Sequence, residues 1–421
     1  MRAGWETKTL GELSEFRRGL TYKKADEVSE SSNVVLRANN VDRDTGKLVF
    51  DELRYIRDDI EIPESKRIRR DTLLICTASG SKSHLGKVAI VDTDEDYAFG
   101  GFMGLLIPCE LVLPRYLYWI TQSDLYRDHL RQLSDGMNIN NLKWKELAQL
   151  VVPLPPLAEQ KRIVAILDEA FEAIEQAEAA TQAAIAPLTH LVERERDALL
   201  LGCEGTADAR LGDHIDLLAG PAFKSAGYTD EPSGIRLLRG DNIVPGATRW
   251  DGLKRWPADD TDAYDRFWLQ TDDVVIAMDR PWISTGFKRA MLTDEDVPSL
   301  LVQRVARLRC RDSLWPRFLY HLISSRSFIE QMVGGQTGTG VPHISGKQIE
   351  AFLFTCPAIE QQRDIAERLD GIIESVQDAV DLRHRKLAML QSLRSSLLRT
   401  AFGGELEHTQ ARTSELAGVT A

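Results

Sequence analysis

The sequence has no long hydrophobic run. No stretch approaches the ~20 apolar residues that a membrane-spanning helix needs. The first residues, MRAGWETKTLGELSEF, also lack the apolar core of a secretory signal peptide. We therefore expect a cytoplasmic chain with no membrane association.

Cysteine is scarce and irregularly placed. The five residues, Cys76, Cys109, Cys203, Cys310 and Cys356, are an odd number and form no CxxC pair. This pattern is typical of reduced structural thiols and argues against a disulfide framework or a zinc cluster.

Catalytic motifs are missing as well. The segment SGSKSHLGKV (79–88) resembles a phosphate-binding loop, but five residues instead of four separate Gly80 from Gly86, and Val88 follows Lys87 where Ser or Thr is needed. The eight His residues form no HExxH pair, and there is no GxSxG elbow. The proline-rich tetrapeptide and the Gly-rich methyl-donor loop of amino-methyltransferases are also absent. We therefore expect no catalytic, cofactor-binding or metal site in this chain.

The net charge of −12 (64 acidic against 52 basic residues) is unevenly distributed. Residues 1–155 have 22 basic and 24 acidic side chains, and residues 206–355 have 18 and 20, so each block has a net charge of −2. Residues 156–205 have 4 and 10, a net charge of −6. A nearly neutral block can still present one basic face, so the overall sign does not exclude nucleic acid.

The most informative positive feature is an internal repeat. At an offset of 202, PLPPLAEQKRIVAILDEA (153–170) aligns with the segment around CPAIEQQRDIAERLDGII (356–373), so that Gln160 meets Gln362 and Asp168 meets Asp370. The same offset aligns LRANNV (36–41) with LRGDNI (238–243), and LPRYLYWI (113–120) with WPRFLYHL (315–322). One offset over some 150 residues predicts a duplicated unit, a globular block followed by a long helix.

Each block has the pattern of a mixed α and β domain. DTLLICTASG (71–80) and DDVVIAMDRP (272–281) are short β-branched runs closed by turn residues. The segments that start at Pro114 and Pro316 have helical periodicity, with proline where its missing N–H is harmless. The predicted fold class is therefore α+β, with boundaries at 1–155, 156–205 (helix), 206–356 and 357–406 (helix), and a flexible tail at 407–421.

The two helical segments repeat apolar residues at spacings of three and four over about five heptads, which is the coiled-coil pattern. The predicted seam residues are Ile163, Leu167, Ala170, Ile174, Leu188, Leu191, Ile365, Leu369, Ile372, Val376, Leu390, Leu393 and Leu397. Pro187 should kink or break the first helix near Ile185. Arg383 and Lys386 fall on seam positions, where they either set the register or mark a slip to Leu387.

Such a seam needs a partner helix. One possibility is a homodimeric coiled coil. The other, which we favour, is that the two helices of one chain pack antiparallel on each other, because the repeat supplies the matching helix and Ala177, Thr181 and Ala184 allow close approach.

The paired proline–Glu/Gln–Gln motifs before long helices, together with RSSLLRTAFGGEL (394–406), resemble the two helical regions of specificity subunits of type I restriction-modification enzymes. LGELSEFRRG (10–19) and LGDHIDLLAG (211–220) also fit, and the resemblance covers residues 5 to about 406. Gln361 stands where the first copy has Glu159, which weakens the match locally.

This resemblance implies two target recognition domains, each reading one half of a split site in double-stranded DNA, and an antiparallel coiled coil that sets the spacer. It implies a pseudo-twofold, non-catalytic chain. Two methyltransferase subunits would supply S-adenosylmethionine, and two motor-nuclease subunits would use ATP and Mg. The alternative is a scaffold that joins two protein partners through its long helices without contacting DNA, which the charge of −12 favours.

Basic and amide side chains on loops suit contacts to phosphates and base edges. The candidate DNA-binding residues of the first block are Arg17, Arg18, Lys23, Lys24, Lys66, Arg67, Arg69, Arg70, Lys82 and Lys87, of which the run KRIRR (66–70) is the densest cluster. Those of the second block are Lys224, Arg280, Lys288, Arg289, Gln336, Thr337, Thr339 and His343. The alternative for each is a solvated surface side chain.

Overall fold

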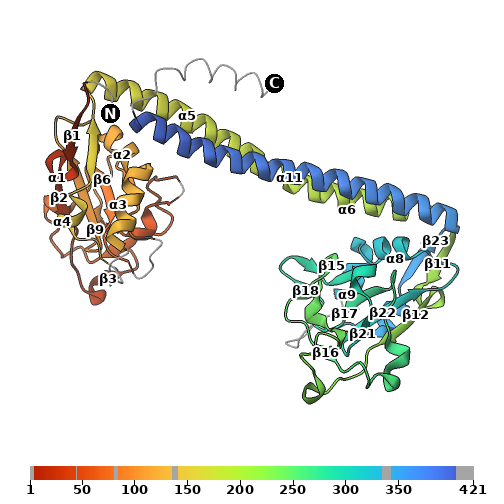
Figure 1. Cartoon of the computed structure of the whole chain (residues 1–421). Helices are drawn as coiled ribbons and strands as arrows, with labels where there is room; N and C mark the ends of the chain where they lie inside the picture. Colours follow the sequence, from red (N-terminus) through yellow and green to blue (C-terminus); the bar gives the residue numbers. More distant parts are fainter. Residues whose placement is uncertain (1–3, 44, 80–83, 135–140, 334–342, 404–421) are drawn as a thin grey trace. The chain divides into compact units, whose positions relative to one another are not determined.

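The protein, in a computed structural model, is described at residues 4–43, 45–79, 84–134, 141–333 and 343–403. The predicted tail at 407–421 lies outside these residues. The chain forms two compact units (Figure 1). Unit 1 takes residues up to 181 and those from 385 onward, and unit 2 takes residues 182–384. The last helix, α11 (Ile359–Gly403), contributes to both.

The described residues up to 183 form ten strands and five α-helices. The strands are β1 (Glu6–Thr9), β2 (Ser14–Arg18), β3 (Glu27–Val28), β4 (Asn33–Leu36), β5 (Arg54–Ile56), β6 (Leu73–Cys76), β7 (Val88–Ile90), β8 (Ala98–Phe99), β9 (Met103–Pro108) and β10 (Val151–Leu154). The helices are α1 (Leu10–Leu13), α2 (Pro114–Gln122), α3 (Asp124–Ser134), α4 (Trp144–Leu147) and α5 (Leu157–Ala183).

Unit 2 begins with helix α6 (Ala186–Leu201) and continues with strands and short helices. The strands are β11 (Thr206–Arg210), β12 (Ile215–Ala219), β13 (Ile235–Leu238), β14 (Ile243–Val244), β15 (Ala247–Thr248), β16 (Arg255–Trp256), β17 (Val274–Ala277), β18 (Trp282–Ile283), β19 (Gly286–Phe287), β20 (Arg289–Met291), β21 (Ser299–Leu301), β22 (Val305–Cys310) and β23 (Leu353–Cys356). The helices are α7 (Leu211–His214), α8 (Pro316–Leu322), α9 (Arg326–Val333) and α10 (Gly346–Glu350).

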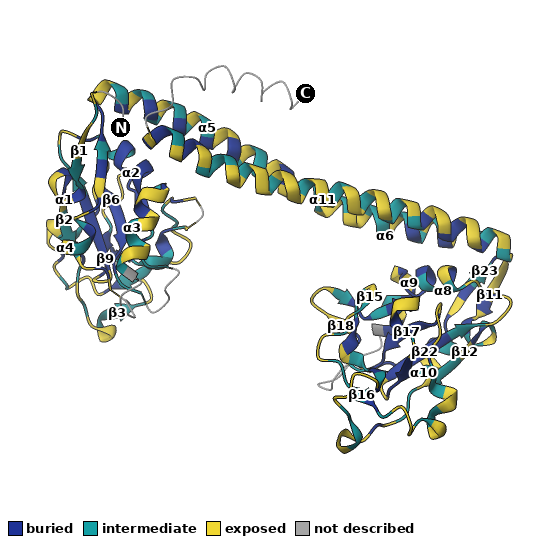
Figure 2. Cartoon of the chain, viewed as in Figure 1, coloured by how far each residue is buried: buried dark blue, intermediate teal, exposed yellow. Residues whose placement is uncertain are grey.

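A four-stranded antiparallel sheet forms the centre of each unit. Its strand order is β2-β9-β6-β7 in unit 1 and β12-β22-β17-β20 in unit 2, so strands with the same place in the repeat occupy the same place in the sheet. The two apolar runs predicted as strands form β6 and β17, whose residues are all buried, as the dark strands of Figure 2 show. The α+β fold class is confirmed.

Smaller sheets and helices complete the two units. In unit 1 a second sheet has the order β3-β5-β4-β8, and in unit 2 a sheet has the order β16-β13-β21. Helices α2 and α8 start at prolines, as predicted, and pack on the central sheet with side chains that include Tyr116 and Phe318, both fully buried. None of the helices in the described part of the chain is long and apolar enough to cross a membrane.

The joint between each block and its long helix depends on one buried glutamine. Gln160 accepts a hydrogen bond from the backbone N–H of Leu113 (2.8 Å) and donates to the carbonyls of Leu111 (3.0 Å) and Pro155 (2.9 Å). Its side chain is fully buried, so these bonds satisfy backbone groups that water cannot reach. The glutamine therefore fixes the start of α5 on the block that precedes it.

Gln362 makes the same three bonds in unit 2. It accepts from the N–H of Trp315 (2.7 Å) and donates to the carbonyls of Ser313 (3.0 Å) and Pro357 (2.8 Å), again with a fully buried side chain. The glutamine that the repeat places at both joints thus has a structural role in each unit.

An aspartate eight residues further along, about two helical turns, adds a second attachment. In unit 1, Asp168 accepts from Arg115 (2.9 Å) and from the indole N–H of Trp119 (2.8 Å). In unit 2, Asp370 accepts from Arg317 and from the Nε2–H of His321 (3.0 Å). Each attachment connects the first helix after the sheet, α2 or α8, to the long helix.

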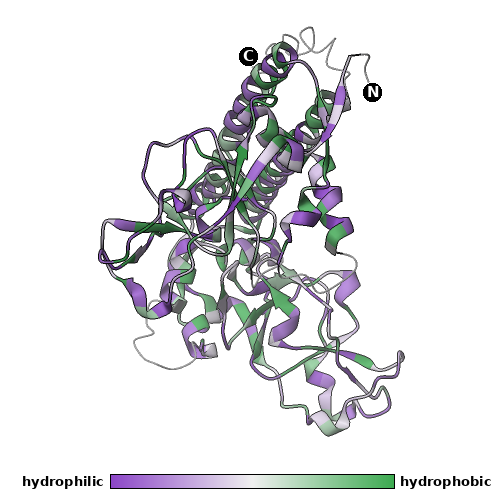
Figure 3. Cartoon of the chain, turned by 90° about the vertical axis from the view of Figure 1, so that its left-hand side faces the viewer, coloured by the Kyte–Doolittle hydropathy of each residue, from purple (hydrophilic) through white to green (hydrophobic). Residues whose placement is uncertain are grey.

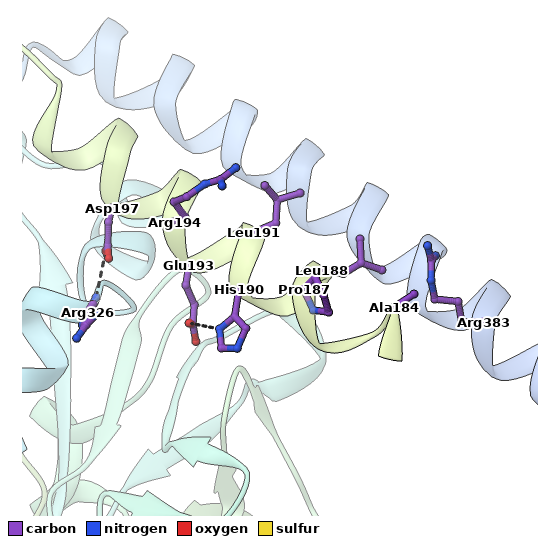
Figure 4. A pocket seen from close by; sticks show the side chains of 10 residues that line it. All are labelled: Ala184, Pro187, Leu188, His190, Leu191, Glu193, Arg194, Asp197, Arg326 and Arg383. Atoms are coloured by element: carbon purple, nitrogen blue, oxygen red, sulfur yellow. Dashed lines mark hydrogen bonds and ion pairs between the residues drawn. The ribbon is translucent and has the colours of Figure 1, made fainter. Parts of the chain in front are cut away.

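The long helices are amphipathic, as the alternating colours along them in Figure 3 indicate. In unit 1, predicted seam residues of α5 share a core with residues of the last part of α11: Ile163, Leu167, Ala170, Ile174, Leu390, Leu393 and Leu397. In unit 2, Ile365 and Leu369 are buried, whereas Ile372 and Val376 are half-buried. Leu188 and Leu191 are also half-buried and lie between α6 and α11 in Figure 4.

Two local expectations about these helices can be checked directly. Helix α5 ends at Ala183 and α6 begins at Ala186, so the predicted break near Ile185, ahead of Pro187, is confirmed. Lys386 is exposed while Leu387 is half-buried, so the slip to Leu387 is the alternative that the structure supports.

Candidate nucleic-acid interface

One edge of the central sheet of unit 1 collects several loops. Strand β2 ends at Arg18, β6 ends at Cys76 and β9 begins at Met103. The register pairs Arg18 with Gly104 and Cys76 with Met103, so the loops that follow β2 and β6 and precede β9 emerge together. We call this edge, and its counterpart in unit 2, the loop edge.

Three segments meet at Thr77 on the loop edge of unit 1. Its backbone N–H and its hydroxyl both donate to the carbonyl of Phe102 (2.9 and 3.0 Å), and its own carbonyl accepts from the N–H of Leu142 (2.7 Å). The Phe102 side chain is 72% exposed. Because exposing a large aromatic ring to water is unfavourable, this ring is a candidate contact for a partner.

The same three segments meet in unit 2. Met278 donates from its N–H to the carbonyl of Arg304 (2.8 Å) and accepts from the N–H of Ile344 (2.8 Å). Next to it, the Asp279 carboxylate pairs with Arg304 (2.9 Å) and accepts a hydrogen bond from the Nδ1 of His343. Side chains of opposite charge are therefore held together where three loops converge.

A short hairpin, β18–β19, projects from the segment that follows β17. Trp282 and Ile283 pair with Phe287 and Gly286, and their side chains are 50% and 36% exposed. An exposed tryptophan on a two-residue strand gives the loop edge of unit 2 an apolar tip suited to contact base edges or sugars.

Most predicted residues of unit 1 lie on or next to the loop edge. Arg18, Lys23 and Lys24 are exposed, and their side chains form no ion pair with the described residues. Arg17 pairs with Glu15 (2.7 Å). Lys82 lies outside the described residues.

Two further predicted lysines bind backbone carbonyls of unit 1. Lys66 donates to the carbonyl of Arg18 (2.8 Å) and Lys87 to that of Val41 (3.3 Å). Both are half-buried, which leaves them less available to a ligand than Lys23 and Lys24.

The three arginines of the densest basic run, KRIRR (66–70), each pair with an acid of the same unit. Arg67 pairs with Asp96 (3.0 Å), and Arg69 pairs with Glu64 (3.0 Å). Arg70 makes two hydrogen bonds to Asp94, both 2.7 Å, and this contact raises the pKa of the guanidinium. The run precedes Leu73 of β6, so its last residues lie at the edge opposite the loop edge.

Two predicted residues of unit 2 have roles inside the domain. Lys288 is 9% exposed and donates to the carbonyl of Gly240, and burial lowers the pKa of its ammonium. Arg289 donates to the Ser324 hydroxyl and to the Phe287 carbonyl, and burial lowers the pKa of this guanidinium as well. Both side chains are occupied by hydrogen bonds inside the domain, so we no longer expect them to bind phosphate.

The other predicted residues of unit 2 remain candidates. Lys224, Arg280 and His343 are exposed, and the latter two flank Asp279 in space. Gln336, Thr337 and Thr339 lie outside the described residues.

The sequence reasoning missed four loop-edge side chains: Phe102, Asp279, Trp282 and Arg304. For two of them a signal was available, because the offset of 202 places Arg304 on Phe102. All four are single residues in loops or short strands and belong to no run of charge.

A hollow of about 840 Å³ lies beside α6 (Figure 4). Its lining combines Leu188 and Leu191 with charged side chains. His190 interacts with Glu193 (3.4 Å), and the backbone N–H of Arg326 donates to Asp197 (3.2 Å). These groups are paired with one another and do not converge on a common point, so the hollow lacks the geometry of a catalytic site.

Burial raises the pKa of Cys76 to about 11 and that of Cys310 to about 12, so neither thiol is activated. The described residues include no group of three or more His, Cys, Asp or Glu side chains placed to hold a metal ion.

The sequence of this chain is similar to those of known DNA specificity proteins. Residues 2–184 match the family model described as the type I restriction modification DNA specificity domain. The specificity subunit of the StySPI type I restriction enzyme of Salmonella potsdam is 26% identical over 423 residues, which cover 96% of this chain and 89% of that protein. The EcoKI specificity subunit of Escherichia coli K12 is likewise 26% identical over 425 residues, with the same coverage.

Two solved structures have a similar fold. A chain from a study of assembly and conformational transition of the type I R-M system has a TM-score of 0.77 at 21% identity, covering 96% of this chain and 99% of that one. The HsdS subunit of Thermoanaerobacter tengcongensis has a TM-score of 0.63 at 21% identity, covering 96% and 98%. Residues 2–184 therefore match the type I restriction modification DNA specificity domain, and 96% of the chain is similar in sequence and fold to specificity subunits of type I restriction enzymes.

Proposed function

We propose that this chain is the sequence-specific DNA recognition subunit of a type I restriction-modification complex and that each unit reads one half of a bipartite site in double-stranded DNA. One observation carries the proposal. Both units have the same central sheet and bring the same three segments together at its loop edge, with exposed basic and aromatic side chains there. Two copies of one surface suit a site with two halves.

The long helices would act as the ruler between the half-sites. In this proposal they pack as an antiparallel coiled coil, and the two units are related by a pseudo-twofold axis. The shared core of α5 with residues 385–403, and the buried Ile365 and Leu369 near α6, support this arrangement. The buried glutamine and the aspartate at each joint would hold the block at a fixed position and orientation on its long helix. The length and the rotation of the helices would then set where each block meets the DNA.

Chemistry would come from other subunits. Two methyltransferase subunits would bind S-adenosylmethionine and methylate adenine, and two motor-nuclease subunits would use ATP and Mg for cleavage. This chain would contribute recognition alone, with no catalytic residue of its own, and would act in the cytoplasm.

The test is selection from a randomised pool. The chain is assembled with its methyltransferase partner, mixed with DNA duplexes of random sequence, and the bound duplexes are sequenced. We expect two short conserved blocks separated by a fixed number of unspecified base pairs, and methylation only where both are present. A complex that selects no sequence, although the chain assembles with its partner, would instead support the scaffold function.

A further inference from the structure

Asp279 is the centre of a charged constellation on the loop edge of unit 2. Its carboxylate pairs with the Nη1 of Arg304 (2.9 Å) and accepts from His343, and Arg280 follows it directly in the chain. The Arg304 side chain is 68% exposed, whereas that of Asp279 is 27% exposed. The less exposed carboxylate thus holds the guanidinium of an arginine that faces solvent, and it is the only ion-pair partner of this arginine among the described residues.

Both arginines beside Asp279 have an unfavourable backbone. Arg280 has φ of 44° and Arg304 has φ of 66°, in the left-handed region that L-residues other than Gly, Asn and Asp rarely adopt. The other described non-glycine residues with positive φ are Asp71, Asp208 and Asp272, which tolerate it better. Strain of this kind is typical of functional sites, because selection for stability alone would favour glycine.

Unit 1 shows that the charges are not needed to build the junction. There, Ala78, Phe102 and Asn141 occupy the places of Asp279, Arg304 and His343, since Ala78 forms a bridge with Asn141 as Asp279 does with His343, and Thr77 makes the backbone bonds that Met278 makes in unit 2. The backbone bonds that join the three segments are retained, from Thr77 to Phe102 and from Leu142 to Thr77. The ionic constellation is therefore an addition specific to unit 2 on a junction that forms without it.

We propose that Arg304 is a base-reading residue of unit 2 that contacts a guanine in the major groove, and that Asp279 and His343 are its positioning residues. This inference rests on the proposed function. The planar guanidinium suits the O6 and N7 acceptors of guanine, which two parallel N–H groups can contact together. The carboxylate limits the rotamers of the arginine before DNA binds. The guanidinium therefore loses less conformational entropy on binding and is held in an orientation that suits guanine.

Arg304→Gly separates reading from folding, because glycine relieves the strained φ. The variant complex should show no loss of Tm, yet lose a G·C preference at one position of one half-site in pool selection. Its affinity for the wild-type site should fall about 5- to 150-fold, the range for one bidentate base contact. The matched control is Asp272→Gly, a strain relief at the start of β17 on the opposite edge, which should leave the selected sequence unchanged.

Two further variants test the chemistry. Arg304→Lys keeps the charge and loses the planar fork, so it should bind the pool but weaken the G·C preference. Asp279→Asn should relax that preference without reducing affinity for unrelated DNA, because it removes a negative charge.

The outcomes are distinguishable. If Arg304→Gly selects the same two half-sites as the wild type, this inference is wrong while the proposed function stands. If the wild-type complex selects no sequence at all, the proposed function itself fails.

Discussion

At the scale of single residues, the buried glutamines explain why the two joints share a motif. Gln160 and Gln362 each satisfy one backbone N–H and two carbonyls in places closed to water. Glutamine is one of the few side chains that can accept and donate at once, so the position tolerates few alternatives.

We expect Gln362→Leu to destabilise unit 2 by about 3 kcal/mol, since it leaves buried polar groups without partners. Hydrogen exchange along a urea series, which reports the peptides of unit 2 separately, measures the loss. The matched control is Gln176→Leu on the exposed face of α5, which should change stability by less than about 0.5 kcal/mol. Equal effects of the two substitutions would contradict the role of the joint.

His321 makes the stability of unit 2 depend on pH. Burial lowers the pKa of its imidazole below 6.5 even though Asp370 raises it, and Arg196 and Arg317 also oppose the charged form. Its Nδ1 is buried and has no hydrogen-bond partner among the described residues, which suits a neutral ring.

Because the pKa in the folded state is the lower one, unfolding takes up protons as the pH falls below about 6.5. Unit 2 should therefore lose stability below that pH. Unit 1 has Trp119 in this place and should not share the loss. Hydrogen exchange at pH 7.5 and pH 5.5 measures both in one sample, and His321→Gln should abolish the difference. If both units weakened equally, or the variant kept the difference, another group would be responsible.

At the scale of elements, the loop edge and the basic run 66–70 behave differently. Arg67, Arg69 and Arg70 pair with acids that follow 24 to 29 positions later or precede by 5, and local sequence patterns do not reveal these partners. Arg18, Lys23 and Lys24 form a less dense basic cluster in the sequence, but their side chains are exposed and form no ion pair with the described residues.

Replacing Arg18, Lys23 and Lys24 together by glutamine should reduce the slope of log K against log salt by about 2 to 3, because each lost phosphate contact contributes about 0.9. The matched control replaces Arg69 and Arg70, which should leave the slope almost unchanged. DNA binding of the assembled complex at several salt concentrations gives both values. A larger change for the Arg69 and Arg70 pair would place the interface at the other edge.

Much of the secondary structure could be predicted from the sequence, because it depends on local patterns. The strands β6 and β17, the proline starts of α2 and α8, and the break before Pro187 follow from apolar runs and from the missing proline N–H. The candidate interface depends on contacts between distant segments. Lys288 and Arg289 read as a basic pair in the sequence, and only the packing around Gly240 and Ser324 shows that both serve the interior.

At the scale of the whole molecule, the repeat determines how the parts relate to function. Two similar blocks are each joined to a long helix through the same glutamine and aspartate, and this arrangement is what the proposed reading of two half-sites a fixed distance apart requires. The negative charge of residues 156–205 lies on a helical segment, which leaves the loop edges free to bind an anionic partner.

The central claim is that the helices set the spacing and the blocks set the bases. Glu178 and Arg394 form an ion pair (2.8 Å) and mark facing positions of α5 and α11 in unit 1. Inserting one heptad after Glu178 and one before Arg394 should lengthen the rod by about 10 Å while preserving its seam. The same heptad in α5 alone, which breaks the register, serves as the control and should lose binding.

The deciding measurement is pool selection, or methylation mapping in cells, with the double-insertion variant in its complex. The account predicts the same bases in both half-sites and a spacer longer by about three base pairs. Altered half-site bases with an unchanged spacer would contradict it.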